Sequence, residues 1–164
     1  MQTFLPYKDI STIASELDSK RLNKQILECF QILKVLSNND PHAAWRNHPA
    51  VKMWRGYEGG LWDYTMNMVV EATLRGIKTD KNLDNLITLR DLCSESWGRG
   101  MPEWFDDEEI MSRVTTTHQA NLYKKAPEMY PQYIDAVTSA DNRPCCPDRK
   151  IPCSYYWVTH EQVA

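Results

Sequence analysis

The stretch that decides the fold is "DSKRLNKQILECFQILKVLS", which runs from Asp18 to Ser37. Its apolar side chains recur at the period of an α-helix, at Leu22, Ile26, Cys29, Phe30, Leu33 and Leu36. Asp18 is a favoured N-cap residue, and the polar run from Ser37 to Pro41 is typical of a helix break. The sequence therefore predicts one long amphipathic helix over about 18–37.

Further helices are predicted on both sides of it. A shorter one precedes it, with Asp9 or Ser11 as its cap. A weaker helix is predicted over 82–95, and another runs from a cap at Asp106 or Asp107 to Lys125, before a proline. No segment alternates as a strand does, so we expect an all-α fold.

The stretch "WRNHPAVKMWRGYE" (45–58) predicts another helix start. Asn47 or His48 is the cap, proline follows in the favoured first turn, and helix continues to Arg75. The pair Gly59-Gly60 interrupts this segment and leaves two interpretations open. Either the helix breaks there, or another element approaches too closely to leave room for a Cβ atom.

The length of 164 residues suits one domain with a continuous core. We expect a compact single-domain helical bundle over 1–138, followed by an irregular tail over 139–164 that is rich in Pro, Asp, Asn and Cys. The start "MQTFLPYKD" lacks the pattern of a signal peptide, and no apolar run approaches the roughly 20 residues of a membrane span. A cytoplasmic protein without a membrane partner is expected, and its oligomeric state is left open.

Charge is distributed unevenly along a chain whose net charge is −3. Residues 1–60 hold eight Lys/Arg and six Asp/Glu, a balance of +2, whereas residues 61–164 hold eleven and sixteen, a balance of −5. The acidic total argues against nonspecific coating of nucleic acid. Any site for a polyanion should therefore draw on the N-terminal third.

Four hydrogen-bonding side chains fall within an arc of about 100° on the long helix, namely Arg21, Lys24, Gln25 and Glu28. A solvated stripe is one interpretation. The other is the floor of an active site, because the apolar Ile32 and Val35 continue the same face one turn later.

Polar residues with two possible roles also occur elsewhere. His118 and Asn121 share a helix face with apolar residues, so they should point inward, either as a bonded core pair or as part of a site. The stretch 45–58 interleaves cationic and aromatic groups, which can clamp phosphate and stack a base or can form the edge of a core.

The tail could also form a zinc site, with Cys145, Cys146, Cys153 and His160 as ligands. Adjacent cysteines chelate poorly compared with a pair that has a two-residue spacer, and no second pair follows. We therefore expect no metal and no cofactor, and we expect the five cysteines to be free thiols.

Four stretches in order resemble the pyrimidine-dimer DNA glycosylase (endonuclease V-like) family: "MQTFLPY", "LDSKRLNKQILECFQIL", "WRNHPAVKMWRGYE" and "HQANLYKKAPEMYPQY". The resemblance covers about residues 1–135 and is strongest to a bacterial and phage branch with an "MQTFLPY" start. It implies a compact helical fold and a DNA repair enzyme, which excises a damaged pyrimidine and then cleaves the strand as a lyase.

The resemblance also implies which residues act. The chain's α-amine would attack the sugar C1′ to form an imine, and Glu28 aligns with the family's catalytic carboxylate. The predicted catalytic residues are Met1, Lys24, Glu28 and His118. The predicted substrate-binding residues are Arg21, Gln25, Arg46, His48, Trp54, Tyr57 and Asn121.

Gln2 departs from the family pattern, because removal of the initiator methionine needs a small second residue. The nucleophile is then the Met1 amine, the Lys24 side chain, or a water activated by Glu28. The acidic net charge favours a single strand or a nucleotide over a duplex, and the sequence names no particular lesion. The alternative function is a noncatalytic module that binds a nucleotide or modified base in the same pocket.

Overall fold

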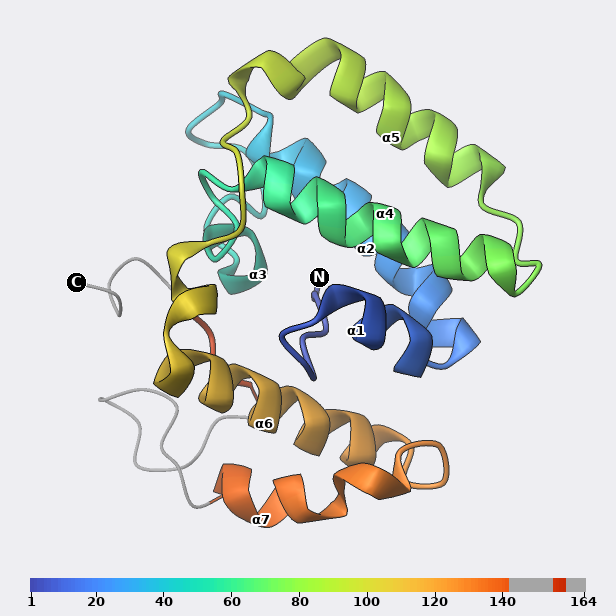
Figure 1. Cartoon of the computed structure of the whole chain (residues 1–164). Coiled ribbons are helices and arrows are strands. Elements are labelled where there is room, and N and C mark those ends of the chain that lie inside the picture. The colour runs from blue at the N-terminus through green and yellow to red at the C-terminus, as the bar shows by residue number, and fades with distance from the viewer. Residues whose placement is uncertain (142–154, 159–164) are drawn as a thin grey trace. The chain divides into compact units, whose positions relative to one another are not determined.

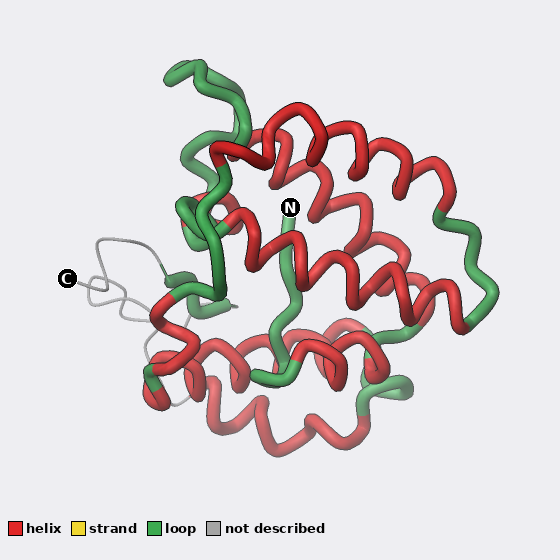
Figure 2. Tube along the Cα trace, turned by 45° about the horizontal axis from the view of Figure 1, so that its top comes forward, coloured by secondary structure: helices red, strands yellow, loops and turns green. Residues whose placement is uncertain are grey.

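The computed structural model describes residues 1–141 and 155–158 (Figure 1). Within them the chain forms α-helices joined by loops and short 3₁₀ turns, with no strand (Figure 2). The helices are α1 (Ile10–Glu16), α2 (Ser19–Leu36), α3 (Pro49–Lys52), α4 (Glu58–Leu74), α5 (Asp80–Cys93), α6 (Glu108–Lys125) and α7 (Ile134–Asp141). The predicted all-α fold is confirmed.

Contacts group the chain into two compact units. The first unit consists of Met1–Thr3 and Ile10–Pro102. The second unit consists of Phe4–Asp9 and the described residues from Glu103 onward. The chain thus begins in the first unit, contributes one short segment to the second, and returns to the first at α1.

In the first unit α2 packs along α4, as Figure 1 shows. The predicted N-cap is confirmed, because the Asp18 carboxylate accepts the backbone N–H of Arg21 at 3.2 Å. Such a cap stabilises a helix by about 1 kcal/mol. Leu22, Ile26 and Leu33 are fully buried as predicted, so the amphipathic pattern directs α2 into the core.

Arg75 joins α1 to the end of α4. Its guanidinium donates to the backbone carbonyls of Leu17 at 2.7 Å, Ala14 at 3.1 Å and Ser15 at 3.0 Å, and to the Glu71 carboxylate at 2.9 Å. The last carbonyls of a helix have no partner within the helix, so a cation placed there satisfies both their hydrogen bonds and the helix dipole.

The prediction of a helix continuing from Pro49 is wrong, because helix is interrupted between α3 and α4. Gly56 has a φ of 85°, and its N–H donates to the Glu58 carboxylate at 3.1 Å, so the chain turns before Gly59. Gly59 and Gly60 lie in the first turn of α4. The close-approach interpretation is therefore the right one.

Residues 98–101 make that close approach. The N–H of Gly59 donates to the carbonyl of Gly98 at 2.8 Å, and the backbone of Gly100 occupies the space that a Cβ atom on Gly60 would need. The Glu58 carboxylate also accepts the N–H of Gly98 at 2.8 Å. A buried carboxylate thus ties the turn before α4 to the loop beside it.

In the second unit α6 packs against α7 through small side chains, with Ala120 against Ala136 and Ala140. The predicted cap of α6 is confirmed at Asp107, which accepts the N–H of Ile110 at 3.0 Å. Helix α7 extends beyond the predicted start of the tail at 139, and no helix was predicted there. The domain boundary itself stays a prediction.

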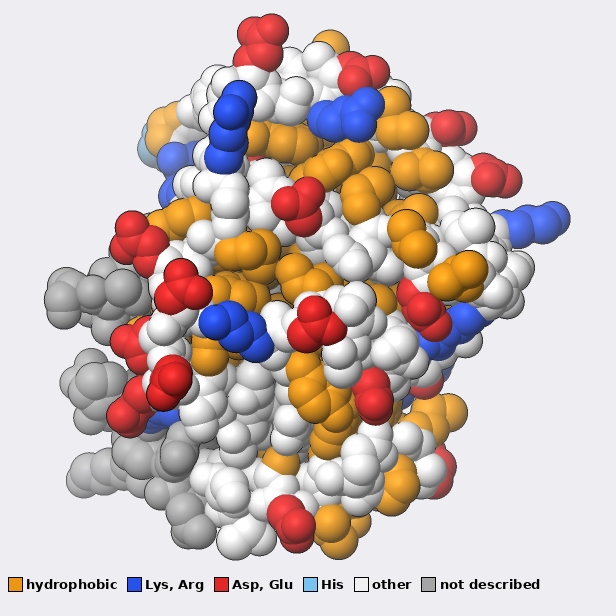
Figure 3. Space-filling model, in the orientation of Figure 1, with side chains coloured by type: hydrophobic (Ala, Val, Ile, Leu, Met, Phe, Trp, Pro, Cys, Tyr) orange, Lys and Arg blue, Asp and Glu red, His pale blue; other side chains and the backbone are white. Residues whose placement is uncertain are grey.

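Within the described residues no helix is long and apolar enough to cross a membrane. Exposed apolar side chains nevertheless occur on the first unit, including Val70 and Leu74 on α4 and Leu92 on α5. Figure 3 shows hydrophobic side chains over these helices, interspersed with charged side chains of both signs. Cys29 and Cys93 are free thiols, as predicted.

Gly60→Ala should lower the free energy of unfolding by about 1–3 kcal/mol, the usual cost of overpacking. The neighbour is backbone and cannot rotate away, so this loss should outweigh the gain of up to about 1 kcal/mol that alanine gives a helix. Chemical unfolding measures the change. Val70→Ala on the exposed side of the same helix should stay within about 0.5 kcal/mol, and equal stabilities for the two variants would contradict the close approach.

Candidate functional site

The side chain of Gln25 fixes the start of the chain against α2. Its Nε2 donates to the backbone carbonyl of Gln2 at 2.7 Å and to Oε2 of Glu28 at 3.2 Å. Its Oε1 accepts the hydroxyl of Tyr64, on α4, at 2.6 Å. Gln25 is fully buried. One amide group therefore places a carboxylate next to the first residues of the chain.

Trp54 holds the next residue. Its indole N–H donates to the hydroxyl of Thr3 at 3.0 Å, and the backbone N–H of Thr3 donates to the side-chain oxygen of Gln2 at 2.8 Å. Trp54 and Thr3 are both fully buried. The predicted substrate-stacking role of Trp54 is corrected, because the indole has no exposed face and instead supports the chain start.

The polar face of α2 is divided between the interior and solvent. The Glu28 side chain is only 13% exposed, and its Oε1 lies 3.7 Å from Nζ of Lys24, whose side chain is 68% exposed. Arg21 is bound to the capping carboxylate of Asp18 at 3.0 Å. Lys24 is thus solvated, whereas Gln25 is buried and Glu28 is largely shielded from solvent. The interpretation of this face as the floor of an active site stays a prediction.

His48 lies near the amino terminus of the chain. Its Nδ1 accepts the N–H of Ala50 at 3.1 Å, which confirms it as the cap of α3. Burial lowers the pKa of His48, and the positive charge of the chain's α-amine lowers it further. The ring of Trp45 contacts the His48 ring, with centroids 5.8 Å apart, and Trp45 lines the same pocket as Met1. Met1 and His48 therefore belong to one region of the first unit.

Arg46, the remaining predicted cation, and Tyr57 lie in the loops on either side of α3. Arg46 donates to the carbonyl of Asn38 at 3.4 Å, and its own carbonyl accepts Arg55 at 2.6 Å. Tyr57 is half-buried and immediately precedes α4. The structure thus brings Arg46 into the connection before α3, and the phosphate-holding role predicted for it stays a prediction.

A pocket of about 340 Å³ opens beside the chain start. Its lining residues are Met1, Gln31, Lys34, Val35 and Trp45. Neither Gln31 nor Lys34 is among the site residues that the sequence predicts. The helical spacing in the sequence indicates part of this lining, because Gln31 and Val35 follow Glu28 by three and seven residues and so lie on the same helix face.

His118 and Asn121 lie in the second unit and are buried, so the predicted inward orientation is confirmed. His118 Nδ1 accepts the backbone N–H of Leu5 at 2.9 Å, and the Asn121 amide donates to the carbonyl of Thr117 at 2.8 Å. Both side chains therefore have structural partners. Glu28 belongs to the first unit and His118 to the second. That these two side chains line one pocket therefore stays a prediction.

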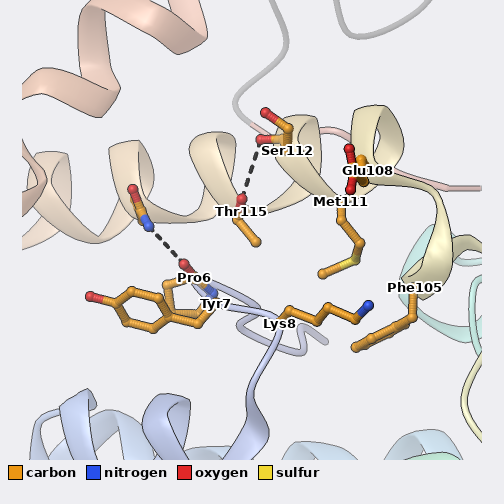
Figure 4. Close-up of a pocket in the computed structure, with 9 residues that line it drawn as sticks. Pro6, Tyr7, Lys8, Phe105, Glu108, Met111, Ser112 and Thr115 are labelled. Carbon is orange, nitrogen blue, oxygen red and sulfur yellow. Dashed lines mark hydrogen bonds between the residues drawn. The ribbon is translucent and has the colours of Figure 1, made fainter.

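The second unit has a larger pocket of about 440 Å³, drawn in Figure 4. It lies between the segment that carries Tyr7 and Lys8 and the start of α6, with Met111 and Thr115 on its wall. Gln119 donates to the carbonyl of Pro6 at 2.7 Å and fixes that segment. None of the predicted site residues lines this pocket, whereas Met1 lines the pocket of the first unit, so we take the candidate site to be in the first unit.

No group of three or more His, Cys, Asp or Glu side chains is placed to hold a metal ion in the part of the chain that the structure describes. The ligands considered for zinc, at positions 145, 146, 153 and 160, lie outside the described residues.

Gln25→Leu should lower the free energy of unfolding by at least about 2 kcal/mol. The buried carbonyl of Gln2 and the hydroxyl of Tyr64 would each lose a hydrogen-bond partner, and each loss costs about 1–3 kcal/mol. Thermal and chemical unfolding measure the loss. Asn23→Ala on the exposed side of α2 should change stability by no more than about 0.5 kcal/mol. A Gln25→Leu protein as stable as the wild type would contradict the network.

The stability of the fold should depend on His118 at mildly acidic pH. Burial lowers the pKa of His118 from 6.5 to about 3, and the positive charge of Lys125 contributes. The unfolded chain binds a proton below pH 6.5 and the folded chain does not, so the stability that the neutral imidazole contributes is present above pH 6.5 and is lost as the pH falls toward 3.

His118→Asn keeps an acceptor for the backbone N–H of Leu5 and removes the imidazole that takes up a proton in the unfolded chain. Between pH 6.5 and about 5, the slope of unfolding free energy against pH should fall by up to about 1.4 kcal/mol per pH unit relative to the wild type. Denaturant titrations at several pH values measure both slopes. Parallel curves for the two proteins would show that the pKa of His118 does not change on folding.

The family model for pyrimidine dimer DNA glycosylases matches residues 1–85, just over half of the 164 residues. No curated protein and no solved structure matches the chain. The matched range contains every residue of the arrangement around Gln25, from Met1 to Tyr64, and the whole of the first pocket. The chain therefore belongs to the pyrimidine dimer DNA glycosylase family.

Proposed function

We propose that the protein is a DNA N-glycosylase that excises damaged or modified pyrimidines by attack at the sugar C1′. Membership of the family points to DNA as the substrate. One observation supports the proposal above the others. The Gln25 amide binds both the Gln2 carbonyl and the Glu28 carboxylate, so an acidic group and the start of the chain are adjacent.

Glu28 is the proposed catalytic carboxylate. Departure of a base from C1′ builds positive charge on the sugar, and a fixed carboxylate beneath the sugar stabilises that charge. The Glu28 side chain is largely shielded from solvent, and Gln25 restrains it by a hydrogen bond. A carboxylate held in this way needs little reorganisation as the charge develops.

The Met1 α-amine is the proposed nucleophile. Its nitrogen lone pair forms a bond to C1′ while the C1′–N bond to the base breaks, and the base leaves with the electron pair and takes up a proton. Loss of protons from the attacking nitrogen and opening of the sugar then give an imine, with Glu28 moving protons. Gln2 and Thr3 are held by Gln25 and Trp54, which supports a fixed position for the amine next to them.

The family's lyase step, in which the imine leads to strand cleavage, is part of the proposal. The Lys24 amine lies 3.7 Å from the Glu28 carboxylate, but most of its side chain is in solvent. Restraint of a nucleophile lowers the entropic cost of attack, which favours the Met1 amine over Lys24.

Glu28→Gln should reduce base release by about 100-fold or more, the usual effect of removing one electrostatic stabiliser. The substrates are oligonucleotides that contain ultraviolet-induced dimers, 5-hydroxymethylcytosine or an abasic site, and the assay scores free base and strand breaks. Glu95→Gln, an exposed carboxylate in the same unit, is the matched control and should keep full activity.

Borohydride distinguishes the nucleophiles. An imine should be trapped as a covalent protein–DNA adduct, and acetylation of the Met1 amine should abolish it, whereas Lys24→Ala should not. Base release without trapping assigns the attack to water. If none of the substrates gives product while they raise the melting temperature, the enzyme proposal fails and the noncatalytic binding module is correct.

A further inference from the structure

Trp45 combines strain with exposure. Its φ of 69° makes it the one non-glycine residue with a positive φ in the described part of the chain. A left-handed backbone is strained in an ordinary L-residue, because it brings the Cβ atom too close to a carbonyl oxygen. The Trp45 side chain is nevertheless 60% exposed, so burial of the indole does not offset that strain. A strained backbone at an exposed aromatic residue is an observation that calls for a functional explanation.

The indole borders the pocket at the chain start. Met1 lies on that pocket's wall, as do Gln31, Lys34 and Val35 from α2. The ring of Trp45 also contacts the ring of His48, with centroids 5.8 Å apart. His48 is fixed as the cap of α3, so its ring gives the indole a constant neighbour. The left-handed turn thus holds an aromatic face beside the proposed nucleophile.

The chemistry of the wall suits a nucleobase. A volume of about 340 Å³ lies at the lower end of the range of about 300–1,000 Å³ for small-molecule sites. An indole stacks on any planar base, the Gln31 amide can both donate to and accept from a base edge, and the Lys34 ammonium can pair with a phosphate. Gln31 and Lys34 are exposed, so both can exchange water for these partners.

We propose that this pocket receives one unstacked, planar nucleobase that stacks on Trp45. Gln31 would then hydrogen-bond to the edge of the base, and Lys34 would pair with a phosphate of the same strand. The inference rests on the proposed function in taking DNA as the ligand.

The test separates stacking from other contacts. Two fluorescein-labelled duplexes are compared, one with a single unpaired central cytosine and one with a tetrahydrofuran abasic analogue in its place. Both are titrated against the full chain carrying Glu28→Gln, so that no turnover occurs. Trp45→Ala in that background should weaken binding of the first duplex about 10-fold, and of the second by no more than about twofold, because loss of one base stack is in this range.

Two further variants keep the result interpretable. Trp45→Phe retains an aromatic face and should keep most of the affinity, and Leu92→Ala, an exposed apolar change on α5, should have no effect. Trp45→Gly relieves the strain, so it should leave the melting temperature unchanged or higher while affinity falls. Loss of affinity together with loss of thermal stability would assign Trp45 a structural role and overturn the proposal.

The outcomes also distinguish this inference from the proposed function. If the wild type releases base, and the Glu28→Gln protein binds the cytosine duplex equally well with and without Trp45→Ala, the stacking platform is overturned and the glycosylase stays intact. Binding that depends on both the cytosine and Trp45, without base release from any substrate, supports the platform and removes the glycosylase.

Discussion

The buried carboxamide of Gln25 is the interaction on which the candidate site depends. A primary amide both donates and accepts, and here the nitrogen binds the Gln2 carbonyl and Glu28 while the oxygen binds Tyr64. A glutamate at this position would lack the donor for the carbonyl, and a leucine would lack both functions. The chain start, α2 and α4 are therefore joined at one point, and the carboxylate proposed for catalysis is held by that same group.

Local signals were sufficient to predict α2 and α6, because a capping aspartate, a 3.6-residue apolar period and a breaker occur within one stretch of chain in each case. The carboxylate of the site was also identifiable, by the family resemblance at Glu28. Burial of Gln25 was not, since its partner Tyr64 is 39 residues away in the sequence. A polar side chain three residues from a glutamate gives no indication that it lies inside until its tertiary partner is known.

The errors have the same physical origin. The chain turns between α3 and α4 because Glu58 binds backbone groups of Gly56 and Gly98, and one of these is 40 residues distant. The helical pattern over 49–75 contains no sign of that contact. Trp54 appeared suited to stacking in a segment rich in aromatic and cationic residues, yet its hydrogen bond to Thr3 places it in the core. In both cases a long-range hydrogen bond overrides a local preference.

The site thus has a fixed part and a solvated part, and their roles differ. Gln25, Thr3 and Trp54 are buried and bonded to one another or to backbone, so they fix positions and have little capacity to bind a ligand. Gln31, Lys34 and Trp45 are exposed, and each can replace water with a partner. Removing water from these groups costs free energy, and only contacts with a complementary ligand offset that cost. Selection of a base should therefore depend on the exposed part, while the position of Glu28 depends on the buried part, so the two properties can be altered separately by substitution.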